Sequence, residues 1–138
     1  MATKRVLSIQ SHVAYGYVGN RAAVFPLQRM GYEVITVNTV QFSNHTGYGK
    51  WTGEVFSPAH IQDLLNGVYE HTQQVDAILS GYLGDASIGN IVMNAKDKFN
   101  CDLWLCDPVM GDFGRDIFVR PGLPEFFKVE AVKRAKIM

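Results

Sequence analysis

Four short, largely apolar runs recur along the chain, and segments with the apolar spacing of an α-helix separate them. The strand-like runs cover residues 5–10, 32–40, 75–81 and 102–108. The helix-like segments cover residues 19–31, 57–72 and 87–99, and the pattern of residues 121–135 is partly helical. Strands that are apolar throughout are typical of parallel sheets with helices on both faces. The sequence therefore predicts a three-layer α-β-α fold with a mostly parallel central sheet.

Residue types at the helix ends predict several boundaries. In the segment 19–31, Asn20 is a candidate N-cap and Gly31 a candidate C-terminal stop. Pro26 lies inside this pattern and predicts either a kink or a shortened first turn. The Ser57–Pro58 pair predicts the start of the helix 57–72.

The composition excludes several functional classes. The 138 residues suffice for one modest domain, and 47% of them are hydrophobic, as in soluble globular proteins. The formal net charge is zero without a basic run, which argues against a nucleic-acid partner that needs phosphate neutralisation. No apolar run approaches the roughly 20 residues of a membrane span or has the form of a signal peptide. We therefore expect no membrane partner and a cytoplasmic location.

The two cysteines, Cys101 and Cys106, fall in one strand-like run. Five residues of a strand span roughly 16 Å, whereas the Cα atoms of a disulfide lie within about 7 Å. The spacing is also a poor signal for zinc without further ligands. We predict reduced cysteines in the core, as in a cytoplasmic protein.

Most of the unusual polar residues follow the four predicted strands. In parallel α/β folds, ligands bind beyond the carboxyl ends of the strands, so these segments are the candidate site. They read "QSHVAYGYVGN", "QFSNHTGYGKWTG", "SGYLGD" and "CDPVMGD". The first lacks the glycine spacing of a dinucleotide-binding fingerprint, and no P-loop is present in the sequence.

Each candidate residue has two interpretations at this point. Ser11 suits a ligand contact or a hydrogen bond within its loop, and Tyr82 suits a pocket wall or a surface turn. His45 can stack on a ligand or titrate near neutral pH, and Thr46 offers a hydroxyl, or both belong to a plain loop. Asp107 with Asp112 suits a cation beside phosphates, or a Pro-Gly turn.

The order and separation of four motifs resemble the pyridoxal kinases, which belong to the ribokinase-like superfamily. The motifs are "SIQSHVAYGYVGNRAA", "NTVQFSNHTGYGKWTG", "LSGYLG" and "CDPVMGD". The resemblance extends from Arg5 to about Asp112, and more loosely to Met138. Hydroxymethylpyrimidine kinases share the fold, but we do not expect them to carry "VQFSNHTGY". The resemblance implies transfer of the ATP γ-phosphoryl group to the 5′-hydroxymethyl of pyridoxal, pyridoxine or pyridoxamine.

The resemblance also implies roles for individual residues. Ser11 resembles the residue that hydrogen-bonds the pyridine ring, and Thr46 the one that contacts the ring's polar substituents. The other expected substrate contacts are ring-packing His45 and Tyr82, apolar Val18, and Gly47, which is Gln in some members. Asp107 resembles an acid associated with ATP and cations, and is the expected metal ligand. Asp112 resembles a second acid near the phosphates. The implied cofactors are ATP and Mg²⁺, with a monovalent cation such as K⁺.

Family members run to roughly twice this length, and their second half carries the adenine-binding loops and a G-x-G-D motif with the catalytic base. No such motif follows Asp112 here. The expectation is that residues 1–138 are the N-terminal part of one ribokinase-like domain, without the ATP-binding half and inactive alone. The full-length relative is expected to be a homodimer. Two alternatives stay open: a non-catalytic pyridoxal-binding module, and a related hydroxymethylpyrimidine or sugar kinase.

Overall fold

The four predicted strands are neighbours in one five-stranded sheet in a computed structural model that describes residues 2–138. The strand order is β3-β2-β1-β4-β5. The strands are β1 (Arg5–Val13), β2 (Glu33–Phe42), β3 (Gly53–Val55), β4 (Ala77–Ser80) and β5 (Leu103–Cys106). All neighbours pair in parallel except β2 and β3, which are antiparallel. The expected mostly parallel sheet is confirmed.

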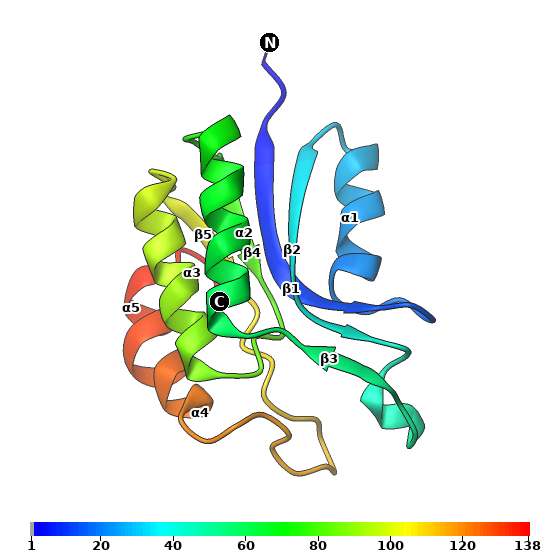
Figure 1. The fold of residues 1–138 in the computed structure, drawn as a ribbon. Coiled ribbons are helices and arrows are strands. Elements are labelled where there is room, and N and C mark those ends of the chain that lie inside the picture. The colour runs from blue at the N-terminus through cyan, green and yellow to red at the C-terminus, as the bar shows by residue number, and fades with distance from the viewer. Residues whose placement is uncertain (1) are drawn as a thin grey trace.

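Helices cover both faces of this sheet. They are α1 (Asn20–Arg29), α2 (Pro58–His71), α3 (Ala86–Lys98), α4 (Leu123–Phe126) and α5 (Val132–Arg134), with a π-helical turn at Phe127–Ala131 between the last two. Figure 1 shows α1 on one side of the sheet, and α2 with α3 on the other. The three-layer α-β-α fold class is therefore confirmed.

The two faces of β1 differ in chemistry because successive side chains of a strand point to opposite sides. Leu7 and Ile9 are fully buried in the main apolar core, together with Ile61 and Leu65 of α2. Ser8, between them, points to the other side and donates a hydrogen bond of 2.7 Å to Asn20 Oδ1 of α1. The main core therefore lies under α2 and α3, and a polar contact joins α1 to the sheet.

The predicted start of α1 is wrong in one respect. Gly19, not Asn20, occupies the N-cap position, and Asn20 is a buried residue of the first turn. Its side chain bonds to the neighbouring strands and caps no backbone amide of its own helix. Pro26 lies inside α1, which continues past it to Arg29, and Gly31 follows the helix end with a φ of 90°.

The helices α2 and α3 each begin within one residue of their predicted starts. Ser57 caps α2 by accepting a hydrogen bond from the His60 backbone amide, and Pro58 is the first helical residue. Asp85 caps α3 by accepting one from the Ser87 amide. These caps fix the ends of the two helices that cover the main core.

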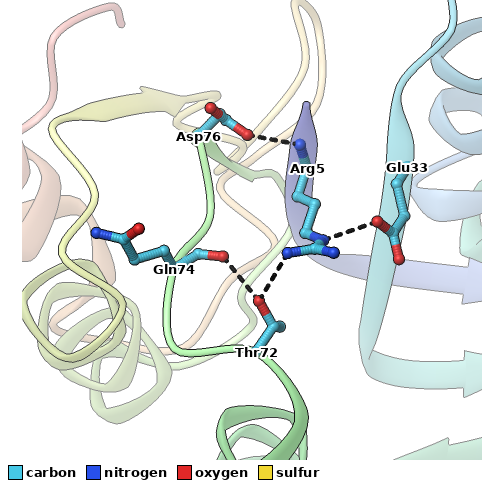
Figure 2. Close-up of polar contacts among 5 residues, drawn as sticks. All are labelled: Arg5, Glu33, Thr72, Gln74 and Asp76. Carbon is cyan, nitrogen blue, oxygen red and sulfur yellow. Dashed lines mark hydrogen bonds and ion pairs between the residues drawn. The ribbon is translucent and has the colours of Figure 1, made fainter. Parts of the chain in front are cut away.

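A polar cluster joins the segments that lie at the amino ends of the strands (Figure 2). Arg5 Nε donates to Glu33 at 2.7 Å, which links β1 to β2. The Arg5 backbone amide donates to Asp76 at 2.7 Å, and the Arg5 guanidinium donates to Thr72 at 3.3 Å. Both bonds link β1 to the segment before β4. Arg5 thus joins the amino ends of β1 and β2 to the segment before β4. The candidate site lies at the opposite, carboxyl ends of the strands.

Cys101 and Cys106 are free and buried, as predicted. Burial raises the pKa of both thiols, so they are neutral apolar side chains near neutral pH. Within residues 2–138, no helix combines the length and the apolar character needed to cross a membrane.

Candidate functional site

A cavity of about 430 Å³ lies where the carboxyl ends of β1, β2, β4 and β5 meet, at the edge of the sheet predicted to bind ligands. Its lining residues come from β1, β2 and β3, from all four segments that follow β1, β2, β4 and β5, and from a later stretch that holds Phe118. They are Gln10, Ser11, Val13, Val18, Gly19, Phe42, His45, Thr46, Trp51, Val55, Gly81, Tyr82, Asp107, Val109 and Phe118.

Six of the eight predicted site residues line this one cavity. They are Ser11, Val18, His45, Thr46, Tyr82 and Asp107. They are separated by up to 96 residues in sequence (107 − 11), and the parallel sheet brings them together. Gly47 and Asp112 are not among the lining residues.

Gly47 lies directly behind the His45 ring. Its backbone amide donates to His45 Nδ1 at 3.1 Å. A Cβ atom at residue 47 would lie 2.7 Å from that nitrogen and 3.0 Å from Arg115 Nη1. A side chain here would therefore displace the imidazole, so Gly47 shapes the cavity through His45.

Two pairs of aromatic rings form the apolar walls. Phe42, the last residue of β2, packs against Trp51 with ring centroids 4.3 Å apart. Tyr82 stacks with Phe118 at 6.4 Å and an interplanar angle of 30°. The cavity is therefore bounded by flat surfaces, with Ser11, His45, Thr46 and Asp107 as polar groups among them. That combination suits a small aromatic ring with polar substituents.

The second candidate segment, residues 41–53, contains more strand pairing and hydrogen bonding than its glycine-rich, polar composition predicts. Gln41 and Phe42 belong to β2, and Gly53 begins β3, which pairs with β2 through Phe42. Between them, Asn44 Nδ2 donates to the carbonyl oxygens of His45 and Lys50 at 3.0 and 2.9 Å. The segment is a closed β2–β3 connection that holds His45, Thr46 and Trp51 over the end of the sheet.

A hydrogen bond from β2 holds the backbone of Tyr82 in place. The buried Thr39 hydroxyl donates to the Tyr82 carbonyl oxygen at 2.7 Å. Desolvation by burial raises the pKa of the Tyr82 phenol, and the Arg120 charge lowers it by less. The phenol is therefore neutral near neutral pH and is available as a hydrogen-bond donor.

The acidic side of the site is open. Asp107 is exposed directly after β5, and no side-chain hydrogen bond or ion pair to it is found in the described chain. Asp112 forms an exposed ion pair with Arg115 at 3.5 Å. Among residues 2–138, no group of three or more His, Cys, Asp or Glu side chains is arranged to hold a metal. One carboxylate fits a magnesium ion only if phosphate and water supply the remaining ligands.

Sequence reasoning missed several lining residues. Gln10 ends the first strand-like run and opens the candidate segment after it, but no ligand contact was predicted for it, although a polar residue in an apolar strand is a signal. Val55 lines the cavity from the short edge strand β3, which the sequence pattern did not predict. Phe118 comes from a segment after the last motif.

Two other hollows are less suited to a polar ring. A groove of about 660 Å³ runs along α1 beside Tyr17 and Phe25, away from the predicted site residues. A second hollow of about 540 Å³ adjoins the cavity and shares Gln10, Gly19 and Asp107 with it. The shared residues make the second hollow an extension of the candidate site toward β5 and α1.

Comparison with known proteins finds relatives that match nearly the whole of this chain. No family model matches the chain. The chain is 53% identical over 139 residues to the pyridoxal kinase PdxY of Granulibacter bethesdensis, covering 96% of this chain and 49% of that protein. It spans about half the length of the curated relatives it matches.

Solved structures give the same result. The pyridoxal kinase from Leishmania donovani in complex with ADP and pyridoxamine is 34% identical with a TM-score of 0.79, over 95% of this chain and 49% of that one. The pyridoxal kinase of Entamoeba histolytica with PLP is 26% identical with a TM-score of 0.86, over 97% and 50%. The expected ribokinase-like fold class is confirmed for the half that is present. The chain is a homologue of the pyridoxal kinases over about half of their length.

Proposed function

We propose that the chain supplies the vitamin-binding half of a pyridoxal kinase, which transfers the ATP γ-phosphoryl group to the 5′-hydroxymethyl of pyridoxal, pyridoxine or pyridoxamine. The observation that supports this most is the single cavity lined by six residues chosen for that chemistry from sequence. Its flat aromatic walls and few polar groups match a substituted pyridine ring. Solved relatives with ADP and pyridoxamine bound support the same ligand class.

The proposed substrate contacts follow from the cavity walls. Ser11 hydrogen-bonds the pyridine ring, and Thr46 contacts its polar substituents. His45 and Tyr82 pack on the ring, and Val18 completes the apolar wall. Gly47 contributes by leaving room for the His45 imidazole.

The proposed phosphate side is formed by the acids after β5. Asp107 would hold a Mg²⁺ ion together with ATP phosphates, and Asp112 would lie near them once Arg115 is displaced from it. The metal, when bound, would neutralise charge on the transferring phosphoryl group. A monovalent cation such as K⁺ belongs to the same proposal. The β2–β3 connection would exclude water from the reaction.

We further propose that residues 1–138 form the N-terminal part of one kinase domain, whose catalytic base lies in the other half of the full-length enzyme. The coverage of relatives, 49% in the first of them, supports this division. The chain alone is then a pyridoxal-binding module that does not turn over ATP. Two further proposals rest on the resemblance alone: a homodimeric full-length enzyme and a cytoplasmic location.

The test measures equilibrium binding of pyridoxine to the chain by calorimetry, with the Thr46→Val variant as the probe. Loss of one hydrogen bond is worth about 1 kcal/mol, so we expect affinity to fall roughly fivefold. Thr52→Val is the matched control, because Thr52 lies in the same connection but does not line the cavity. An equal loss in both variants contradicts the proposed role of Thr46.

The same samples are then mixed with Mg²⁺-ATP and pyridoxal, and formation of pyridoxal 5′-phosphate is followed by its absorbance. Binding without product supports the division of the enzyme proposed above. Product formation by the chain alone would show that the base lies within these residues. Absence of pyridoxine binding would overturn the proposed function itself.

A further inference from the structure

One lining residue of the cavity, Gln10, is buried more deeply than its chemistry favours. It lies in β1, only 8% of its surface is exposed, and its neighbours Ile9 and Ser8 are fully buried. Glutamine is rarely buried to this extent without a specific partner. Gln10 also lines both the cavity and the adjoining hollow, together with Asp107. It therefore lies at the junction between the two spaces.

A chain of hydrogen bonds orients the Gln10 amide. Asn20 Nδ2 donates to Asn38 Oδ1 at 2.8 Å and lies 3.4 Å from the Val37 carbonyl oxygen, which can only accept. Asn20 must therefore present Oδ1 to Ser8, whose hydroxyl donates to it at 2.7 Å. Ser8 Oγ has then used its only proton and accepts from Gln10 Nε2 at 2.8 Å.

This direction leaves the Gln10 carbonyl oxygen, Oε1, turned away from Ser8. Among residues 2–138, the only side-chain hydrogen bond of Gln10 is the one that Nε2 donates to Ser8, and since no buried side-chain nitrogen or oxygen there lacks a partner, Oε1 is open to solvent. Oε1 lies against Gly81, which also lines the cavity, and a Cβ atom at residue 81 would come within 2.5 Å of it. An oriented, accessible acceptor without a protein donor is ready to receive a hydrogen bond from a ligand.

We infer that Gln10 is a specificity-determining residue whose Oε1 accepts a hydrogen bond from the hydroxyl of the substrate's 5-hydroxymethyl group. This inference rests on the proposed function. The hydroxyl that receives the phosphoryl group must lie at the boundary between the vitamin and the phosphates. Gln10 lies at the boundary that the cavity shares with the hollow beside Asp107. The Asn38–Asn20–Ser8 chain acts through Gln10 by fixing which amide atom faces the ligand.

The test compares equilibrium binding of two ligands to the chain: pyridoxine, and the analogue in which a methyl replaces the 5-hydroxymethyl group. A site that loses a hydrogen bond to its ligand rejects the analogue. We expect the wild-type chain to prefer pyridoxine about fivefold to tenfold. Gln10→Met keeps the side-chain length without the acceptor and should reduce this preference to about onefold. Gln62→Met, the same change on the outer side of α2, should leave the preference unchanged.

A second variant tests the position of the amide rather than its chemistry. Gly81→Ala keeps Gln10 but places a methyl group against Oε1, and the ordinary φ of Gly81 accepts alanine without backbone strain. We expect a partial loss of the preference. If thermal melting shows that Gln10→Met does not fold, the preference of Gly81→Ala for pyridoxine over the analogue tests the inference instead.

The outcomes separate the inference from the proposed function. Unchanged discrimination in the Gln10 and Gly81 variants overturns the inference and leaves pyridoxine binding intact. Absence of discrimination in the wild-type chain also overturns it. If the wild-type chain binds neither ligand, the proposed function is wrong and the inference is wrong with it.

Discussion

Gly19 sets the position of Ser11, the residue proposed to hold the pyridine ring. Its backbone has φ 57° and ψ −133°, a combination that residues with a Cβ atom rarely adopt. A Cβ atom at residue 19 would also collide with the Ser11 carbonyl oxygen and Oγ. The loop after β1 thus approaches the strand end more closely than a side chain permits, and this approach forms the cavity wall.

Gly19→Ala should therefore lower both stability and affinity. We expect a loss of about 1–3 kcal/mol in the free energy of unfolding from backbone strain, measured by urea denaturation. We also expect weaker pyridoxine binding because Ser11 must move. Gly31→Ala separates the two effects, because Gly31 also has positive φ, 90°, but has no atom near its Cβ position. Full affinity in the Gly19 variant, despite its lower stability, contradicts the role of this contact.

At the scale of the element, the cap of α3 gives the chain a dependence on pH. The Asp85 carboxylate accepts hydrogen bonds from the Ser87 hydroxyl and amide, and these lower the pKa of Asp85 below its usual 3.8. Folding then favours the charged form. Its stabilising contribution is complete above pH 3.8 and is lost as the pH falls through the lower pKa of the folded chain.

Asp85→Asn keeps an acceptor at the cap but removes the charge. Near neutral pH we expect a loss of about 0.5–1 kcal/mol in the free energy of unfolding, because a negative charge favours the helix N-terminus. The difference from wild type should shrink as the pH is lowered below 3.8. Asp63→Asn, on the exposed side of α2, is the control and should show no such trend. A constant difference from neutral to acidic pH would refute the cap's contribution.

The elements that the sequence predicted best are those whose own residues determine them. The helix α2 was predicted from its Ser57–Pro58 start and its apolar spacing, and α3 from its apolar spacing alone, and each begins within a residue of its predicted start. The strand β3 was missed because its three residues are exposed and form a strand only by pairing with β2. Asn20 was assigned to a cap because residue preferences are local, whereas its actual partners lie on β1 and β2.

The same reasoning explains the site. Motif residues after each strand were predicted because the parallel sheet places all these segments at one edge. β1 extends to Val13, beyond its apolar run, because His12 and Val13 still pair with Gln41 and Phe42. Gln10 is the first residue of the first candidate segment, yet it lies inside β1 and not in the loop that follows. Its role depends on a hydrogen-bond chain across three elements that no local pattern contains.

Across the whole molecule, the two faces of the sheet are covered unequally. On the face that carries Ser8, α1 packs against β1 and β2. The register places Leu79 beside Ser8 and Leu105 beside Leu79, so both leucines point to this same face. Leu103 and Leu105 are 41% and 37% exposed. This surface, Leu79 with Leu103 and Leu105, is an apolar patch, and under the proposed division of the enzyme the other half would cover it.

The isolated chain should therefore self-associate through the patch as its concentration rises, because burial of apolar surface drives association. Leu105→Lys places a charge in the patch, and we expect it to shift the association to at least severalfold higher concentration in sedimentation velocity. Leu64→Lys is the matched control, because Leu64 of α2 is 42% exposed but lies on the helical layer across the sheet. If the wild-type chain is monomeric at all concentrations, or if both variants act equally, the patch is not the surface of association.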